Sequence, residues 1–413
     1  MKTYCKPKDI DITDINLISR AIYKAYSGKL RRRDFQRLLL LTCKITREQL
    51  DADLEANDHR RINEALDTLA LIVQSDIRNR QLRISPLRPF QRRDGLTQKL
   101  RNLCKEGAYQ QICEYIAVEA LMPMFRAKLL PCQFGSIPNR GQVRGVRKIE
   151  KIVRRSKKKR LSAIKTDVQK AYPSTKVAMV MALLRRDIGK NEPLLWFIAA
   201  VMGNYPNGVL IIGGYLSTWL FNYVMSYVLR AMMAQGKYRR GRWISFVDGI
   251  VSYADDTTVF GSYSNLKKAL KAACKWAESI GLHIKDCWQI VRFATEDEEK
   301  QNHADRQRGS KKRTGGIDMI GFVVRRRCTI IRRRIWRRVR RQLLRAWRNL
   351  YQTGAIPWWR AKKATSYKGW LKYSDSEKIE VKYHASVIMQ AAGEAVGRHE
   401  RRTNHADLLH TTA

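Results

Sequence analysis

The chain has 413 residues, of which 44% are hydrophobic, so it is long enough for two or three domains with substantial cores. Its 81 Lys and Arg residues against 37 Asp and Glu residues give a net charge of +44. Such a charge repels itself unless a polyanion neutralises it, so we expect a nucleic-acid partner. Membrane-surface binding is the alternative, which the spread of basic residues along the whole chain disfavours.

No apolar run approaches the roughly 18 residues of a membrane span. The eight cysteines lack a Cys-x-x-Cys spacing, which argues against a zinc site or a disulfide framework. The first residues also lack the apolar core of a signal peptide. We therefore expect a cytoplasmic protein with no membrane partner.

Residues 1–88 have the apolar periodicity of helices. Thr13 is the predicted N-cap of an amphipathic segment that continues to Tyr26, and residues 35–41 and 62–73 are further helical stretches. Two prolines, Pro86 and Pro89, then mark a boundary.

A basic segment with a turn signal follows this boundary. Asp94-Gly95 lies between basic arms and predicts a hairpin, and residues 107–130 predict a core helix. Arg140 then stands in a Pro-Asn-Arg-Gly sequence, which is either an exposed turn or a ligand contact. The basic helix predicted over residues 144–160 is either a phosphate track or a solvated helix end.

The next segment predicts a strand that runs into Asp167 and breaks at Pro173, with an aromatic residue, Tyr172, five positions after the aspartate. Tyr172 either packs in the core or faces a ligand. Further along, Gly213 and Gly214 allow close approach of the backbone, and a helix is predicted to begin near Ser217.

Two adjacent carboxylates lie at the tip of the β-hairpin predicted over residues 250–260. Asp255 and Asp256 repel each other unless a cation is present, and oxygen ligands of this kind suit Mg²⁺. A solvated turn explains the pair equally well when the stretch is taken alone.

The rest of the chain alternates predicted elements with charged segments. A helix is predicted over residues 266–279, a strand over 281–285, a charged mobile loop over 295–316 and a single strand over 317–324 with Gly321 at a tight position. From residue 325 the chain is intensely basic. A helix there is predicted to bury Ile335, Val339, Leu343 and Ala346, with Trp358, Trp359 and Trp370 in the core and a frayed tail after Arg398.

Taken together, Asp167 with Tyr172, Gly213-x-x-x-Ser217 with Asn222, and Tyr253-Ala254-Asp255-Asp256 resemble the motifs of bacterial reverse transcriptases. The resemblance implies an α+β right-hand polymerase with an antiparallel palm sheet. It implies a helical N-terminal extension over residues 1–88, fingers over 89–160, a palm over 161–324 and a basic helical thumb and tail over 325–413.

The resemblance also implies site residues. Asp167, Asp255 and Asp256, with the carbonyl of Val168, would hold two Mg²⁺ ions, for which Mn²⁺ can substitute. Residues implied at the incoming nucleotide are Tyr172, Arg140, Gly213, Ser217 and Lys285. Residues implied at template and primer are Asn222, Gly321, Arg333, Arg337 and Arg341. Tyr172 would favour deoxynucleotides by leaving little room for a 2′-hydroxyl.

Two residues depart from the family pattern and indicate which group of reverse transcriptases the chain resembles. Ile212 precedes Gly213 where many members have Gln, and Thr218 follows Ser217 where many have Pro. Isoleucine at that position resembles the error-prone enzymes of diversity-generating retroelements. We therefore expect RNA-directed DNA synthesis from an RNA template, a DNA or RNA primer and dNTPs, in a bacterial or phage-encoded system with an accessory protein or a homo-oligomer. A reverse transcriptase of antiviral defence with a structured RNA, and an RNA-binding maturase-like protein, remain alternatives.

Overall fold

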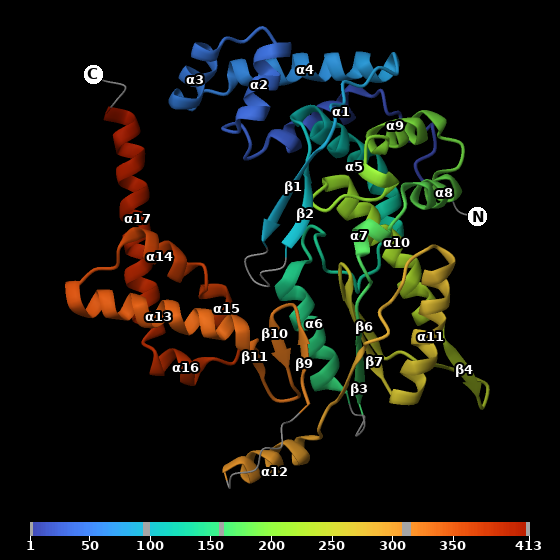
Figure 1. Ribbon diagram of the computed structural model, residues 1–413, viewed down its shortest axis with the longest axis vertical. Helices are drawn as coiled ribbons and strands as arrows, with labels where there is room; N and C mark the ends of the chain where they lie inside the picture. The colour runs from blue at the N-terminus through green and yellow to red at the C-terminus, as the bar shows by residue number, and fades with distance from the viewer. Residues whose placement is uncertain (1–2, 94–99, 157–160, 308–314, 410–413) are drawn as a thin grey trace. The chain divides into compact units, whose positions relative to one another are not determined.

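The computed structural model describes residues 3–93, 100–156, 161–307 and 315–409 (Figure 1). The chain divides into two compact units. Unit 1 comprises Met1–Asn139, Thr166–Ser245 and Lys267–Cys287, and unit 2 comprises Arg140–Lys165, Phe246–Leu266 and Trp288–Ala413. The fold class is α+β, as expected, with mostly helical structure and small antiparallel sheets.

Four helices form the N-terminal part of unit 1: α1 (Ile15–Tyr26), α2 (Arg33–Thr42), α3 (Arg47–Ala56) and α4 (Arg60–Arg78). They confirm the helical prediction, although α3 was not anticipated. The predicted N-cap is wrong by one residue, because the Asp14 carboxylate accepts the bond from the Asn16 amide. The Thr13 hydroxyl instead donates to Asp11.

The basic hairpin is confirmed in β1 (Arg88–Arg93) and β2 (Leu100–Lys105), which pair antiparallel; its predicted turn at Asp94-Gly95 lies outside the described residues. The remaining elements of unit 1 follow α5 (Ala108–Lys128) in the chain, and α5 is buried nearly all round because α1, α9 and α10 pack against it. They are α7 (Ala171–Ser174), α8 (Val177–Ile188), α9 (Glu192–Met202), the 3₁₀ turn η1 (Pro206–Gly208), α10 (Tyr215–Met233), β4 (Gly236–Arg239) and β5 (Arg242–Ser245). Most of helix α11 (Tyr263–Ser279) also belongs to this unit.

Unit 2 contains a four-stranded sheet in the order β6-β7-β3-β8. Its strands are β3 (Ser162–Thr166), β6 (Gly249–Tyr253), β7 (Asp256–Gly261) and β8 (Gln289–Arg292). Helix α6 (Gly141–Arg155) packs so closely on β6 that a Cβ at Gly249 would lie 2.8 Å from the Ile152 side chain. The sheet confirms the predicted strand before Asp167 and the hairpin over residues 250–260.

The strand predicted over residues 281–285 is wrong. Gly281 has a φ of 78° and the Leu282 amide donates to the Ala277 carbonyl, so these residues end α11 instead. Only an isolated bridge between Ile284 and Val168 remains, and the strand that pairs with β3 is β8.

The mobile loop predicted over residues 295–316 is wrong for the part that is described, because α12 (Glu296–Gln307) is helical. The Thr295 hydroxyl accepts from the Glu298 amide and the Glu298 carboxylate accepts from the Thr295 amide, which is a capping box. This signal was present in the sequence and was overlooked.

The single strand predicted over residues 317–324 is two strands, β9 (Ile317–Met319) and β10 (Phe322–Val324), which form a sheet with β11 (Thr329–Ile331). Ile320 and Gly321 have φ values of 53° and 85° and make the turn between them. The Trp370 ring lies against Gly321, where a Cβ would be 2.4 Å from it.

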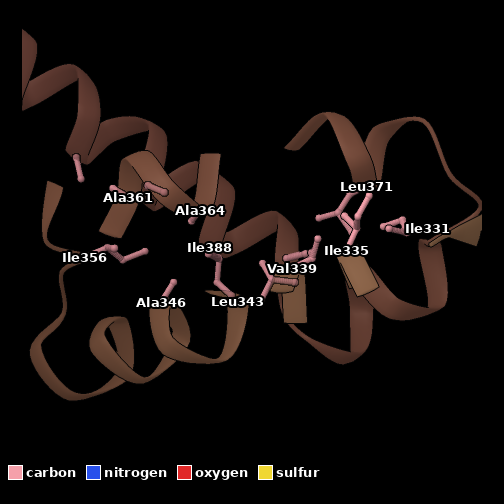
Figure 2. Close-up of a cluster of buried hydrophobic side chains, with 13 residues drawn as sticks. Ile331, Ile335, Val339, Leu343, Ala346, Ile356, Ala361, Ala364, Leu371 and Ile388 are labelled. Atoms are coloured by element: carbon pink, nitrogen blue, oxygen red, sulfur yellow. The ribbon is translucent and has the colours of Figure 1, made fainter. Parts of the chain in front are cut away.

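Helices complete unit 2: α13 (Arg333–Thr353), α14 (Trp358–Thr365), α15 (Lys368–Lys372), α16 (Glu377–Lys382) and α17 (Ala385–Leu409). The predicted apolar stripe of α13 is confirmed and meets Ile356, Ala361, Ala364, Leu371 and Ile388 in one core (Figure 2). Trp358 and Trp359 are 44% and 46% exposed, so their core placement is wrong; α14 buries its alanines instead. The expected fraying after Arg398 is also wrong, since α17 continues to Leu409.

Candidate active site

The two adjacent aspartates lie at the tip of the β6–β7 hairpin in unit 2. Tyr253 pairs with Asp256, which leaves Ala254 and Asp255 as a two-residue turn. Ala254 has a φ of 54°, a conformation that costs a non-glycine residue about 1–2 kcal/mol. The turn is therefore strained at Ala254, and it places Asp255 and Asp256 at the end of two strands that are largely buried.

A lysine that sequence reasoning missed accompanies this hairpin. Lys165 lies on β3, the strand next to β7, and its ammonium group is 3.3 Å from the Asp256 carboxylate. The same group donates to the main-chain carbonyl of Asp318 at 3.0 Å. The signal was the two-residue spacing from Asp167, which places Lys165 and Asp167 on one side of an extended chain.

Asp167 follows β3 directly and belongs to unit 1, where the Lys285 ammonium group contacts its carboxylate. The backbones of the two residues are also joined, because the Lys285 amide donates to the Asp167 carbonyl at 3.0 Å. Lys285, expected at the nucleotide, is thus held beside a predicted metal ligand.

The carbonyl of Val168 points away from its bridge partner. The Gln169 amide donates to the His283 carbonyl and the Lys285 amide to the Asp167 carbonyl, so Val168 and Ile284 form the pair without mutual hydrogen bonds. In such a pair the N–H and C=O groups are directed to the other side of the strand. The Val168 carbonyl is therefore oriented away from residues 283–285, the segment that includes Lys285.

The turn at Gly213 and Gly214, called the glycine turn below, lies between the two aspartate motifs in sequence and packs against the protein interior. Gly213 has a φ of 104° with open space around it, whereas a Cβ at Gly214 would meet Ile211, Glu106 and Ser217 at 2.8–2.9 Å. The Ser217 hydroxyl accepts from the Ile211 amide and is buried. Only glycine at position 214 fits this close contact, and Ser217 holds the turn rather than facing solvent.

Asn222, expected at template or primer, is buried in α10. Its side-chain amide donates to the Gly135 carbonyl at 3.0 Å, and its own main-chain carbonyl accepts from the Gln133 side chain at 2.7 Å. These two bonds fix the loop at residues 133–135 against α10.

Two buried glutamates, Glu106 and Glu114, lie next to the glycine turn, and neither of them was identified from the sequence. Burial and the neighbouring Glu114 raise the pKa of Glu106 to about 10, so Glu106 is protonated at neutral pH. Glu114 accepts from the Tyr205 hydroxyl at 2.6 Å and the Leu216 amide at 3.0 Å, which supply the partners of a buried acceptor. The sequence signal was α5 itself, because a helix that is apolar nearly all round must pair its polar residues inside.

Unit 1 has an open cavity of about 540 Å³, and Glu106 is among the residues that line it. Its lining combines cations with flat rings and the glycine turn: Lys29, Arg32, Lys105, Tyr115, Gly213 and Trp219. The rings of Tyr115 and Tyr215 stack at 4.0 Å, and the Lys29 ammonium group lies 4.6 Å from the Tyr115 ring centroid. Such a surface suits an anionic ligand with an aromatic part, as a nucleotide has.

Tyr172 lies in the short helix α7 and is half-buried. Its ring stacks on Phe221 of α10 at 5.0 Å, which fixes its orientation within unit 1. Part of the residue remains exposed. Tyr172 is therefore packed against α10 on one side and keeps a solvent-exposed part.

In unit 2 the predicted nucleic-acid residues occupy separate places. Arg140 is the N-cap residue of α6 and is part-exposed. Gly321 is covered by Trp370. Arg333, Arg337 and Arg341 are exposed at a four-residue spacing on one side of α13, opposite its buried stripe, and form no ion pair with the residues that the structure describes.

The carboxylates at these positions have the chemistry of ligands for a divalent ion. Across the described ranges, no group of three or more His, Cys, Asp or Glu side chains is arranged to hold a metal ion. Asp167 and Asp256 are nevertheless part-exposed carboxylates that each hold an ammonium group. Hard oxygen donors that already attract a cation fit Mg²⁺, provided that it replaces the lysine contacts.

Comparison with protein-family models gives no match, and comparison with curated proteins gives none either. Among the described residues no helix combines the length and apolar character needed to cross a bilayer.

Proposed function

We propose that the chain is an RNA-directed DNA polymerase that adds deoxynucleotides to a primer on an RNA template. The observation that carries the proposal is the strand order β6-β7-β3-β8. The hairpin with Asp255 and Asp256 at its tip is next to the strand from which the sequence passes into Asp167. These are the three aspartates that the resemblance to reverse transcriptases assigns to the metal ions.

Under this proposal Asp167, Asp255 and the Val168 carbonyl would hold two Mg²⁺ ions, with a weaker role for Asp256. The ions would lower the pKa of the primer hydroxyl and neutralise charge on the phosphates. The primer 3′-oxygen attacks the α-phosphorus, its proton leaves to solvent, and the bond to pyrophosphate breaks.

The lysines supply fixed positive charge near the acidic positions. Lys165 is held by both Asp256 and the Asp318 carbonyl, so its charge stays in place when the nucleotide leaves. Lys285 contacts Asp167 and can turn toward a departing phosphate once a cation takes its place. Both would reduce the repulsion that an incoming triphosphate meets among carboxylates.

The cavity in unit 1 supports the placement of the templating base against the glycine turn. Ile212 and Gly213 line it together with three cations. An isoleucine side chain cannot donate the amide hydrogen bonds that would test a base pair. We therefore extend the proposal to an error-prone enzyme of the diversity-generating type with a dedicated template RNA.

Primer extension tests the proposal. Purified protein, an RNA template with an annealed primer, dNTPs and Mg²⁺ should give full-length cDNA, and Asp255→Asn should reduce the rate by at least about 10³-fold, since it removes a charged ligand with little change of shape. Asp286→Asn is the matched control, because that side chain is 94% exposed. Equal extension by Asp255→Asn and wild type would refute the assignment, and sequencing of co-purified RNA would identify the template.

A further inference from the structure

The β4–β5 hairpin is an exposed two-stranded arm at the end of α10 (Figure 1). Its strands pair from Gly236 with Ser245 to Arg239 with Arg242, and Arg240 and Gly241 form the turn with φ values of 49° and 70°. Every residue from 237 to 245 is exposed. An isolated two-stranded hairpin is only marginally stable in water, so this arm contributes little to the stability of the fold.

The two faces of the arm differ in chemistry. Tyr238 and Trp243 are a cross-strand pair on one face, with ring centroids 5.0 Å apart, and they are 75% and 49% exposed. The opposite face carries Lys237, Arg239, Arg242 and Ile244, and Arg240 extends from the turn. Trp243 is fixed in place because its ring covers Gly236, where a Cβ would lie 2.4 Å away.

The positive charge of the arm is not neutralised by acidic residues within the arm. The sequence from Gly236 to Ser245 contains four cations and no Asp or Glu. None of these cations makes an ion pair within the described part of the chain. Since two paired strands are only about 4.8 Å apart, the long basic side chains can reach round the ribbon to a ligand on the aromatic face.

We propose that the β4–β5 hairpin is a docking site for an unpaired segment of RNA, with bases stacked on Tyr238 and Trp243 and phosphates held by the basic side chains. A strand of this kind repeats a flat ring and a negative charge, which matches both features of the arm. An acidic protein would match the cations alone. A lipid surface would need a wider apolar face than the two rings supply, and the remaining apolar side chain, Ile244, stands among cations on the other face. The choice of RNA rests on the proposed function.

RNA binding by the full-length protein tests this proposal apart from catalysis. The probe is fluorescein-labelled oligouridine of about 15 nucleotides, the span of a typical single-strand site. Anisotropy is followed at fixed salt in EDTA. The aromatic variant is Tyr238→Ala/Trp243→Ala, the rescue variant is Tyr238→Phe/Trp243→Phe, and the control is Leu41→Ala/Leu71→Ala, which removes exposed apolar side chains on α2 and α4. Unchanged thermal unfolding confirms that each variant is folded.

The aromatic variant should bind about tenfold more weakly, while the phenylalanine and control variants bind like wild type. Arg239→Gln/Arg242→Gln should reduce the slope of log affinity against log salt by about 1.4, or about 0.7 for each phosphate that is no longer neutralised. Unchanged affinity in the alanine variant, or no rescue by phenylalanine, would overturn the proposal. The proposal would also be overturned if the alanine variant lost binding to anionic lipid vesicles but kept its affinity for oligouridine.

The two proposals fail separately. If wild type extends primers but its RNA affinity ignores the hairpin, the docking site is wrong and the polymerase stands. If wild type extends no primer but its RNA affinity depends on Tyr238 and Trp243, the polymerase is wrong and the docking site stands.

Discussion

Lys165 and Asp256 form an ion pair across neighbouring strands of the unit 2 sheet, with the ammonium nitrogen 3.3 Å from a carboxylate oxygen. The lysine side chain is 18% exposed and the aspartate side chain 35%. The pair places a protein cation where adjacent carboxylates would otherwise repel each other. It therefore substitutes for part of what a divalent ion would do at this hairpin.

Lys165→Met should make the stability of the protein more dependent on Mg²⁺. Without the ammonium group the carboxylates at the hairpin tip lose their nearest cation, which should lower the free energy of unfolding by about 1 kcal/mol in the absence of metal, given partial solvent screening. Added Mg²⁺ should then raise the melting temperature of the variant more than that of wild type. Thermal unfolding across a Mg²⁺ titration measures this, with Lys8→Met as the exposed control. Equal metal-dependent shifts would contradict the role assigned to Lys165.

Gly321→Ala should be strongly destabilising. The residue has a φ of 85°, and a Cβ there would lie 2.4 Å from the Trp370 ring and 2.9 Å from Ile335. Both the backbone strain and the steric overlap raise the free energy of the folded state, so a loss of at least about 2 kcal/mol is expected. Urea unfolding monitored by tryptophan fluorescence gives the value.

Gly393→Ala is the matched comparison for that change. Gly393 lies within α17, and a Cβ there would have no neighbour within 4 Å. Alanine should stabilise this helix by up to about 1 kcal/mol. If the two variants showed similar stability, the tight packing of the Ile320–Gly321 turn on Trp370 would be wrong.

Glu106→Gln should remove a pH dependence of stability. The pKa of Glu106 is raised by burial, and then by Glu114, from 4.5 to about 10, so the folded state binds a proton that the unfolded state releases above pH 4.5. The stabilisation is complete below the unfolded pKa and is lost as pH rises towards about 10. The free energy of unfolding of wild type should therefore fall between pH 5 and 10.

The glutamine variant keeps the shape and the neutral state of the protonated acid at all these pH values. Its unfolding free energy should fall less steeply over the same range, while Glu64→Gln, at an exposed position of α4, should follow wild type. Urea denaturation at several pH values distinguishes them. Parallel curves for Glu106→Gln and wild type would mean that Glu106 carries no proton in the folded protein.

Much of this arrangement was accessible from sequence because it depends on local patterns. The β6–β7 hairpin followed from apolar residues on both sides of Asp255-Asp256, and the stripe of α13 from the helical spacing of Ile335, Val339 and Leu343. Long-range partners were not accessible. Nothing local indicates that Glu114 would meet Tyr205, or that Lys165 would meet Asp256.

The errors have two physical origins. Gly281 was assigned to a strand, although it ends α11, and residues 317–324 were assigned to one strand because a turn through Ile320 requires an unfavourable φ. Trp358 and Trp359 were placed in the core by their size, whereas α14 buries Ala361 and Ala364. At Gly281 a local helix-end signal was overlooked, whereas in the other two cases tertiary packing overrode the preference of the individual residue.

The exposed arginines of α13 should govern the salt dependence of nucleic-acid binding. Affinity of wild type for a primer–template duplex should fall by about 10³-fold or more between roughly 50 and 200 mM salt. Arg333→Gln/Arg337→Gln/Arg341→Gln should reduce the slope of log affinity against log salt by up to about 3, one unit for each phosphate contact. The buried stripe on the other side of the helix is unchanged in this variant, so its thermal stability should match wild type. A flat titration for wild type would remove the duplex-binding role of this helix.

Under the proposed function, Ile212→Gln should make cDNA synthesis more accurate. Ile212 is half-buried at the edge of the unit 1 cavity and precedes Gly213, whose left-handed φ of 104° leaves open space above it. A glutamine amide at this edge could donate and accept hydrogen bonds to a nascent base pair, and discrimination of about 1–3 kcal/mol would lower misincorporation roughly 5- to 150-fold. Sequencing of cDNA copied from a defined RNA template measures substitution frequencies for wild type and variant. Ile212→Leu is the control, since it keeps the apolar edge and should keep the errors. Wild-type copies as clean as those of Ile212→Gln would show that the residue before the glycine turn does not set fidelity.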